Sequence, residues 1–426
     1  MKLIFRGGAQ EVGRSCIELR TGGDRYLLDC GVKFKEDGFA YPKGLLDVPG
    51  VDGVFITHAH LDHSGGLPFF EHKQLKGPIF CTSQTKILTK ILLKDSFEVA
   101  RIRHLHPAFS KVDLKEVKKD IRVVRFDKKF THRKVGVTFY NAGHIPGSAS
   151  ILIEAEGKRL LYTGDMNLAQ TMIMKEVIPD YGGPIDILIT ESTYGYRDLP
   201  DREALAQRFL DKVEQVLAQG GSVLIPVFAV GRAQEVLQIL SLGEFKAPIY
   251  FDGMAKRITR HILSNPSKYV KHKERLAEMF YEVVHLVKNR EERDRVAQRQ
   301  GIFVTTSGML QGGPVLHYLK HLWHDTKSAV LLTGYQCKRT NGRELLDHGF
   351  VYMKGWRTKV HCQVEKYDFS GHSDLTQLKQ YIECVNPKIL IVQHGDPTSV
   401  VHLTSWAERS LGCDVHGPRV LDEIDC

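Results

Sequence analysis

Short apolar runs alternate with glycine turns from the start of the chain to residue 57. The runs read KLIFRGG, SCIELRTGGDRYLLDCG and VDGVFIT, and three more follow as VGVTFYNAGH, ASILIEAEGKRLLYTGD and IDILITEST. Such short runs bounded by turn residues are typical of β-strands. We therefore predict an antiparallel-rich sheet over the first ~60 residues, a helix over 83–105 and further strands at the three later runs. Polar residues end several strands, including His144, Asp165 and Glu191, which places them on loops at one edge of a sheet.

The pattern changes from about residue 195. After a helix predicted over 202–219, apolar strands alternate with amphipathic helices in GGSVLIPVFAVGRAQEVLQILSL, APIYFDG, GIFVTTSGMLQGGP and SAVLLTGYQ. Fully apolar strands followed by helices predict a parallel sheet covered on both faces. Short strands return after 355. We predict an α/β protein in which one domain, 1–194 and 356–426, is interrupted by an inserted α/β domain, 195–355. The mixed-charge stretch 271–299 is predicted to be a solvated helix face.

The composition is that of an ordinary globular protein. Of the 426 residues, 42% are hydrophobic and 26% charged. No apolar stretch is long enough for a transmembrane helix, and the start, MKLIFRGGAQEVGRS, does not read as a signal peptide. We expect a cytoplasmic protein with no membrane partner. Its eight cysteines form no C-x-x-C pair, so a disulfide framework or cysteine zinc site is not indicated.

Positive charge is concentrated in one segment. The formal net charge is +9, and the segment 86–134 holds 15 Lys and Arg against 6 Asp and Glu. A basic balance suggests a polyanionic partner, nucleic acid first. A solvated lysine-rich surface explains the charge equally well.

The densest candidate chemistry is THAHLDHSGG at 57–66. His58 and His60 can turn toward one metal ion, and Asp62 and His63 toward a second ion beside it. Zinc takes imidazole nitrogen and carboxylate oxygen, and a two-metal centre needs further ligands and a bridging carboxylate. The remaining candidates stand at strand ends and are His144, Asp165 and His394.

These motifs resemble a known family. THAHLDH, AGH and TGD look like the metallo-β-lactamase fold superfamily, and LITESTYG, GRAQE, FSGHSD and QHGD resemble its β-CASP nucleases. The similarity covers the whole chain and is greatest to RNA-processing members: the polyadenylation-factor endonuclease subunit, its archaeal homologues and RNase J. It implies a metallo-β-lactamase αββα sandwich with an inserted α/β β-CASP domain. One departure is Asp396, where many members carry Glu; the carboxylate is kept.

The resemblance also implies roles for particular residues. Two Zn²⁺ ions would be bound, the first by His58, His60 and His144, the second by Asp62, His63 and His394, with Asp165 bridging. Asp29, in LLDCG, matches an aspartate that orients ligands. Asp62 is the natural base or orienter for the attacking water. Glu191 and His372 match the A and B motifs, in which the carboxylate fixes the imidazole tautomer and the imidazole contacts the scissile phosphate or protonates the leaving 3′-oxygen.

The expected substrate is single-stranded RNA. Members of the group that act on RNA keep the histidine of VQHGD, here His394. The start of the helix after VLIPVFAVG is suited to phosphate binding. The residues expected to contact RNA phosphates are Arg232, Ser307, Tyr335, Arg343 and Ser370.

We therefore expect a zinc-dependent ribonuclease that leaves 5′-phosphate and 3′-hydroxyl ends. The sequence leaves endonuclease and 5′→3′ exonuclease modes both open, together with RNA preference, the identity of the metal and oligomeric state. A homodimer is possible, since relatives are often dimers. The alternatives are a small-molecule metallo-hydrolase (thioesterase or lactonase) and a non-catalytic RNA-binding scaffold subunit. The histidines of HYLKHLWH (317, 321 and 324) are expected to be structural, with no carboxylate completing a site.

Overall fold

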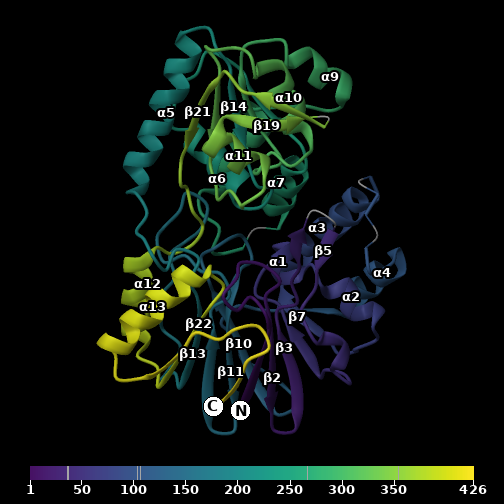
Figure 1. The fold of residues 1–426 in the computed structure, drawn as a ribbon, viewed down its shortest axis with the longest axis vertical. Coiled ribbons are helices and arrows are strands. Elements are labelled where there is room, and N and C mark those ends of the chain that lie inside the picture. The colour runs from purple at the N-terminus through teal and green to yellow at the C-terminus, as the bar shows by residue number, and fades with distance from the viewer. Residues whose placement is uncertain (36–37, 103, 106, 266, 354) are drawn as a thin grey trace. The chain divides into compact units, whose positions relative to one another are not determined.

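The chain forms two compact units in the computed structural model, which describes residues 1–35, 38–102, 104–105, 107–265, 267–353 and 355–426 (Figure 1). The first unit comprises Met1–Gln170, Lys175–Asp198 and His372–Cys426, and the second comprises Thr171–Met174 and Leu199–Gly371. The second unit is thus an insertion, as the sequence indicated. Residues 356–371 were expected in the last part of the first domain; here they belong to the second unit, because β21 (Gln363–Lys366) pairs with β18 (Ala329–Leu332).

Two seven-stranded sheets form the centre of the first unit. The first sheet has the order β24 (Glu423–Asp425), β1 (Lys2–Gly7), β2 (Cys16–Thr21), β3 (Asp24–Leu28), β6 (Gly53–Phe55), β7 (Ile79–Thr82) and β8 (Ile121–Val124). The second has the order β23 (Asp414–His416), β22 (Ile389–Gln393), β13 (Ile187–Glu191), β12 (Lys158–Tyr162), β11 (Ala149–Ala155), β10 (Val135–Asn141) and β9 (Phe130–His132). Each sheet is antiparallel on one side and parallel on the other.

The sheets pack face to face between two layers of helices (Figure 1). The shared core includes Phe5, Phe55, Phe139 and Ile189, which are all fully buried. The outer face of the first sheet is covered by α1 (Leu61–Ser64), α2 (Leu67–His72), α3 (Ser83–Ile102) and α4 (Lys111–Asp120), and that of the second by α12 (Leu375–Val385) and α13 (Pro397–Ser410). A short hairpin of β4 (Lys33–Lys35) and β5 (Gly38–Ala40) and a 3-10 turn (Leu45–Asp47) complete the unit. The predicted αββα sandwich is confirmed.

The second unit is built on a parallel six-stranded sheet. Its order is β16 (His285–Leu286), β15 (Ile249–Asp252), β17 (Ile302–Thr305), β14 (Val223–Pro226), β18 and β21. The helices of this unit are α5 (Arg202–Ala218), α6 (Arg232–Leu240), α7 (Ala255–Ser264), α8 (Lys273–Glu278), α9 (Arg290–Val296), α10 (Pro314–Leu322) and α11 (Asn341–His348). A hairpin of β19 (Phe350–Met353) and β20 (Trp356–Lys359) follows α11. The parallel sheet predicted from the apolar strands is confirmed.

The stretch 271–299 differs from the single helix face expected. It contains α8, a π-helical turn (Met279–Val283), the short strand β16 and α9. Leu276, Phe280 and Val287 are fully buried, so this segment contributes to the core as well as to the surface. In the described parts of the chain, none of the helices combines the length and apolarity that crossing a bilayer requires.

Candidate metal and catalytic centre

The candidate site residues of the first unit follow strands at their carboxyl ends. Asp29 comes directly after β3 and His394 directly after β22, while Glu191 is the last residue of β13. His58 stands just beyond β6 and Asp165 just beyond β12. Strands β12, β13 and β22 are parallel, as are β3 and β6, so their carboxyl ends share an edge within each sheet. The loops from both sheets then meet at one end of the sandwich.

Backbone contacts fix the loop that carries the histidine motif. The amide of Cys30 donates to the carbonyl of His63 (2.8 Å), and the amide of Ser15 donates to that of Asp62 (2.8 Å). Gly164 allows the TGD loop to approach this motif, since a Cβ at that position would lie 2.6 Å from the Cβ of Thr57. Its φ of 57° also favours glycine. The ligand loops are therefore held by the folded backbone of both sheets.

Asp165 lies at the centre of the cluster and is almost fully buried. Its Oδ1 is 3.0 Å from His394 Nδ1 and 3.3 Å from His63 Nε2. Its Oδ2 is 3.6 Å from His58 Nε2 and 3.7 Å from His144 Nε2. One carboxylate thus faces four imidazoles.

The donor atoms fall into three overlapping sets. In the first, one ligand atom each from His58, His60, His144 and Asp165 lies within 4.8 Å of the others. Two further sets, His58 with Asp62 and His63, and His63 with Asp165 and His394, satisfy the same limit. His394 Nε2 is 3.7 Å from Asp62 Oδ2, which joins those two sets. All seven predicted ligands are brought together, with Asp165 common to both sides.

The chemistry of these donors fits divalent cations. His58 Nε2, His63 Nε2, Asp165 Oδ1 and both ring nitrogens of His394 are buried without hydrogen-bond partners among the described residues. Lone pairs that face one another in a buried site require a proton or a metal ion between them. Imidazole nitrogen with carboxylate oxygen is a donor set that zinc prefers.

The charges in the cluster also favour a bound cation. Burial opposes ionisation of Asp165, but His394, His63 and His372 hold its pKa well below the usual range. Burial likewise opposes charge on His394, but Asp165 and Asp62 raise its pKa to about 10. Without a metal, protons on imidazoles balance the carboxylates. Because a ligand nitrogen must be unprotonated, a bound cation would displace those protons.

A hydrogen-bond network behind the cluster sets the imidazole tautomers. Asp29 is fully buried and accepts a hydrogen bond from His63 Nδ1 (2.7 Å), which leaves Nε2 of that ring facing Asp165. The Thr57 hydroxyl donates to Asp29 Oδ2 (2.8 Å), so its oxygen can accept from His58 Nδ1 (3.1 Å). Tyr162 donates its phenol proton to the same Asp29 oxygen (2.8 Å). Asp29 therefore orients ligands on both sides of the cluster.

Glu191 and His372 form a pair next to the ligands. His372 Nδ1 is 2.9 and 2.8 Å from the two carboxylate oxygens of Glu191, which is fully buried and also accepts from the Met166 amide (2.7 Å). The ring of His372 lies 4.5 Å from that of His144. Burial opposes its protonation, but Glu191 and Asp165 together raise the pKa of His372. An imidazole that can hold a proton thus stands beside the candidate metal ligands.

The residues expected to contact phosphate lie in the second unit. Arg232 begins α6 after β14, Ser307 follows β17, Tyr335 follows β18 and Ser370 follows β21. These four parallel strands are neighbours, so their carboxyl ends form one edge of the sheet. Arg343 lies in the first turn of α11, whose Gly342 amide donates to the Met309 carbonyl in the loop after β17.

Not all of these side chains are equally available for a ligand. The Ser307 hydroxyl donates to the Gly312 carbonyl (3.2 Å) and accepts from the Gln311 amide (3.1 Å), so it supports its own loop. Ser370 is buried. Arg343 Nε is 2.6 Å from Asp347 Oδ2 in an exposed pair one helical turn apart. Arg232 begins α6 at the same edge of the sheet.

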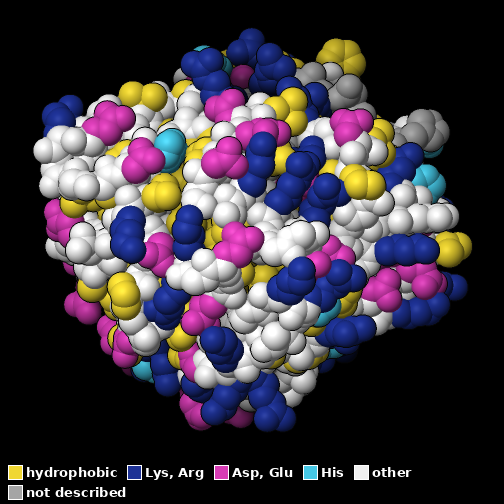
Figure 2. All heavy atoms as spheres, turned by 90° about the horizontal axis from the view of Figure 1, so that it is seen from below, with side chains coloured by type: hydrophobic (Ala, Val, Ile, Leu, Met, Phe, Trp, Pro, Cys, Tyr) yellow, Lys and Arg dark blue, Asp and Glu magenta, His cyan; other side chains and the backbone are white. Residues whose placement is uncertain are grey.

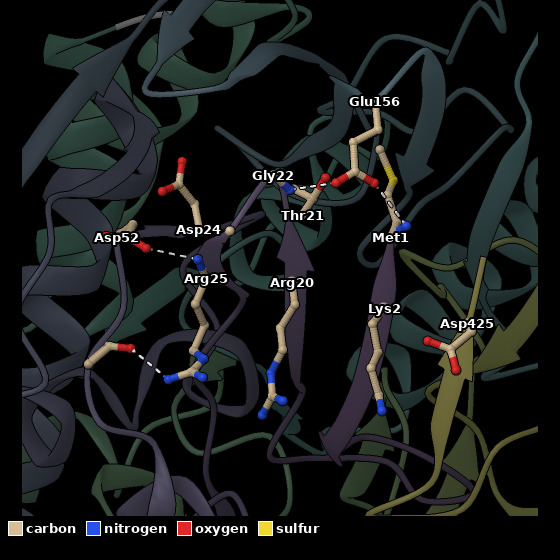
Figure 3. A pocket seen from close by; sticks show the side chains of 12 residues that line it. Met1, Lys2, Arg20, Thr21, Gly22, Asp24, Arg25, Asp52, Glu156 and Asp425 are labelled. Carbon is tan, nitrogen blue, oxygen red and sulfur yellow. Dashed lines mark hydrogen bonds and ion pairs between the residues drawn. The ribbon is translucent and has the colours of Figure 1, made fainter.

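A hollow in the first unit lies away from these residues. It measures about 490 Å³ and opens beside Lys2, Arg20 and Arg25, where β1 and β3 begin, so it is at the opposite end of the strands from Asp29 (Figure 3). Glu156 in its wall accepts from the Gly22 amide (2.6 Å) and the terminal ammonium (3.0 Å). These partners hold turns and the chain end together, so we assign the hollow no chemistry.

Ion pairs balance part of the charge of the basic segment 86–134. Arg101 pairs with Glu98, Lys119 with Glu116 and Lys129 with Glu154, at 2.9, 2.6 and 2.7 Å. On the face shown in Figure 2, Lys and Arg side chains are interleaved with Asp and Glu. The charge excess therefore does not by itself mark one binding surface.

Comparison with known proteins gives the family. Domain models match three parts of the chain: the metallo-β-lactamase superfamily over 9–206, the Beta-Casp domain over 233–345 and the Zn-dependent metallo-hydrolase RNA specificity domain over 357–418. Probable RNase MJ4 of Methanocaldococcus jannaschii is 41% identical over 432 residues, which cover all of both chains. The chain is a β-CASP member of the metallo-β-lactamase superfamily.

Other relatives of this β-CASP protein are also similar over nearly its whole length. RNase aCSPSF2 of Saccharolobus solfataricus is 35% identical over 99% of this chain and 85% of its own. Transcription termination factor FttA of Methanocaldococcus jannaschii is 34% identical over all of this chain and 71% of its own. Among solved structures, a protein of unknown function from Enterococcus faecalis V583 has a TM-score of 0.62 with 15% identity, covering 99% of each chain. That last likeness concerns the fold alone.

Sequence reasoning missed two residues of the β-CASP centre. Thr57 connects Asp29 to His58, and Tyr162 binds Asp29 from the second sheet. Thr57 directly precedes the histidine motif, so its hydroxyl could have been proposed as a hydrogen-bonding group from the sequence. Tyr162 could not, because it lies among the apolar residues of β12.

Proposed function

We propose that this β-CASP protein is a zinc-dependent ribonuclease that hydrolyses phosphodiester bonds of single-stranded RNA, leaving 5′-phosphate and 3′-hydroxyl ends. One observation carries the proposal: the Glu191–His372 pair stands within 4.8 Å, in ligand atoms, of Asp165, the carboxylate shared by the candidate ligand groups. A metal cluster with an adjacent proton donor is what phosphodiester hydrolysis needs. The RNase names of two relatives support RNA as the substrate.

Seven residues would hold two zinc ions. His58, His60 and His144 would bind the first ion, Asp62, His63 and His394 the second, and Asp165 both. When bound, the two ions would lower the pKa of a water molecule and offset the charge that develops on the phosphoryl oxygens. The same donors would also accept other first-row divalent ions, so the identity of zinc is part of the proposal.

The protein's own groups would then perform three tasks. Asp62, partly exposed at the start of α1, would accept a hydrogen bond from the attacking water and orient it. His372 would donate its proton to the leaving 3′-oxygen. Glu191, held by the Met166 amide, would keep the His372 ring in place and stabilise its charged form.

The carboxyl edge of the second unit's sheet would bind the RNA backbone. Open parallel sheets bind ligands at this edge, and Arg232 begins α6 there. In the first unit, partial burial and the charges of Lys86 and Lys118 lower the pKa of Lys90, so three like charges lie near one another there. A neighbouring phosphate would relieve the repulsion among these three lysines.

A homodimer stays a prediction, which light scattering of the purified protein would test.

The deciding experiment incubates purified protein with labelled RNA and matched DNA, with and without a chelator, and adds zinc back after chelation. We expect RNA cleavage that chelation abolishes and zinc restores, with products carrying 5′-phosphate. Turnover of a thioester or lactone with RNA untouched would overturn the proposal in favour of a small-molecule hydrolase. Retention of RNA without turnover would indicate a scaffold. Product patterns on 5′-phosphate and 5′-triphosphate RNA would separate the exonuclease and endonuclease modes.

A further inference from the structure

Three side chains of the kinds that bind metals lie together on the second unit. They belong neither to the metal centre of the first unit nor to the predicted phosphate-binding edge. Asp294 lies on α9, and His317 and His321 lie one turn apart on α10. His317 Nε2 is 2.9 Å from Asp294 Oδ1, and the two imidazole rings are 5.2 Å apart. One ligand atom from each residue falls within 4.8 Å of the other two. Local spacing predicted no carboxylate beside these histidines, because Asp294 belongs to a different helix.

The donors have the character of a transition-metal site. Imidazoles at positions i and i+4 share one face of a helix and can bind the same ion. Two imidazoles with one carboxylate favour zinc, nickel or cobalt over magnesium or calcium, which prefer oxygen ligands alone.

The surroundings hold the two helices in position. Arg293 precedes Asp294 on α9, and Tyr318 follows His317 on α10. Both donate to the buried carboxylate of Asp252: Arg293 Nε is 2.5 Å and the Tyr318 hydroxyl 3.1 Å from Oδ2. Lys256 Nζ completes this inner contact at 3.2 Å from Oδ1. Asp252 therefore holds α9 and α10 together through these two residues, while Asp294, His317 and His321 are all partly exposed. Such a prearranged pair of helices reduces the entropy lost when an ion binds.

We propose that Asp294, His317 and His321 form a third metal site, which binds one divalent transition-metal ion and joins α9 to α10. A plain His317–Asp294 ion pair accounts for the 2.9 Å contact but leaves His321 without a part in it. A metal uses all three side chains. It would stabilise the second unit by mass action, because a site built from two helices does not exist in the unfolded chain.

The test counts ions on the full chain. Protein whose catalytic centre is already loaded with zinc is titrated with Ni²⁺ and with Zn²⁺, followed by native mass spectrometry, calorimetry and thermal melting. We expect one additional ion with an affinity on the order of micromolar and a rise in melting temperature. His321→Ala and Asp294→Asn should each weaken this binding at least about tenfold and remove the rise in melting temperature.

His324→Ala is the matched control, since His324 belongs to the same HYLKHLWH run but lies beyond the end of α10 and outside the cluster. It should bind the additional ion as the unmodified protein does. His317→Ala is the second test of the cluster, and circular dichroism checks its folding. The proposal is overturned if the loaded protein takes up no further ion, or if the ion persists unchanged in His321→Ala and Asp294→Asn. None of these readouts depends on nuclease activity, so they stand apart from the proposed function.

Discussion

Replacement of Asp29 by asparagine tests the metal centre through a residue that would not touch the metal. Asp29 Oδ1 accepts from the Thr57 amide (2.8 Å), and Oδ2 accepts from the Thr57 hydroxyl (2.8 Å), His63 Nδ1 (2.7 Å) and the Tyr162 phenol (2.8 Å). An asparagine must turn its NH₂ group toward donors in either orientation. The variant keeps the size of the side chain while it loses both the charge and one set of hydrogen bonds.

The expected cost follows from these contacts. A buried hydrogen bond to a charged group contributes about 1.5–3 kcal/mol, and each 1.36 kcal/mol is a factor of ten. Asp29→Asn should therefore weaken binding of the second zinc ion about 10- to 100-fold, as loss of such supporting residues does in other metal sites. Competition with a chromophoric chelator at fixed pH measures the affinity directly. Activity at saturating zinc should recover in large part, because the ligands themselves remain.

Tyr162→Phe is the matched control, since it removes one donor to Asp29 and leaves the carboxylate charge and the His63 contact intact. We expect a smaller loss of zinc affinity than in Asp29→Asn, because the carboxylate keeps its charge and its contacts with Thr57 and His63. The reasoning is refuted if Asp29→Asn binds two zinc ions with unchanged affinity while the protein remains folded. It is also refuted if Tyr162→Phe costs more affinity than Asp29→Asn.

Three further predictions concern other parts of the molecule. His394→Ala should lose one of two zinc ions by elemental analysis and most of the activity; unchanged stoichiometry would count against its assignment as a ligand. Arg232→Ala should weaken RNA binding about tenfold at low salt and less at high salt, because salt screens a phosphate contact; a salt-independent loss would instead indicate a folding defect. Burial and then the charge of Asp120 raise the pKa of Glu71 from 4.5 to about 7. The stability from its neutral form is therefore complete below pH 4.5 and lost as the pH rises through about 7. After allowance for partial exposure, Glu71→Gln should stabilise the protein by about 1 kcal/mol at pH 8, or about 2–4 °C in melting temperature, but not at pH 4. The control Glu214→Gln, at an exposed position within α5, should leave the melting temperature unchanged at both pH values.

The sequence predicted the strands and the candidate ligands for one physical reason. His58, His60, Asp62 and His63 lie within a single loop, so their closeness needs no knowledge of the tertiary fold. The more distant residues His144, Asp165 and His394 each follow an apolar run. The strands before Asp165 and His394 belong to one parallel set, whose carboxyl ends meet at one edge. Apolar periodicity and local spacing can both be determined from a single sequence, and both predict ligands at the same end of the sandwich.

Contacts that depend on the packing of separate elements could not be predicted from the sequence. Tyr162 reaches Asp29 only because β12 and β3, from different sheets, lie face to face, and nothing in KRLLY distinguishes its tyrosine from a core residue. The edge strand β21 has four partly buried residues, QVEK, without apolar alternation, so its sheet could not be assigned. Residues 356–371 were expected in the first domain for that reason.

The position of Tyr162 also connects the core to the chemistry. Its ring is fully buried between the sheets, in the same cluster as Phe55 and Phe139, while its hydroxyl holds Asp29. Asp29 in turn fixes His63 and, through Thr57, His58. The relative position of the two sheets therefore sets the orientation of ligands that the histidine motif alone leaves free to rotate. The motif specifies which atoms can bind a metal, and the sandwich core decides where those atoms point.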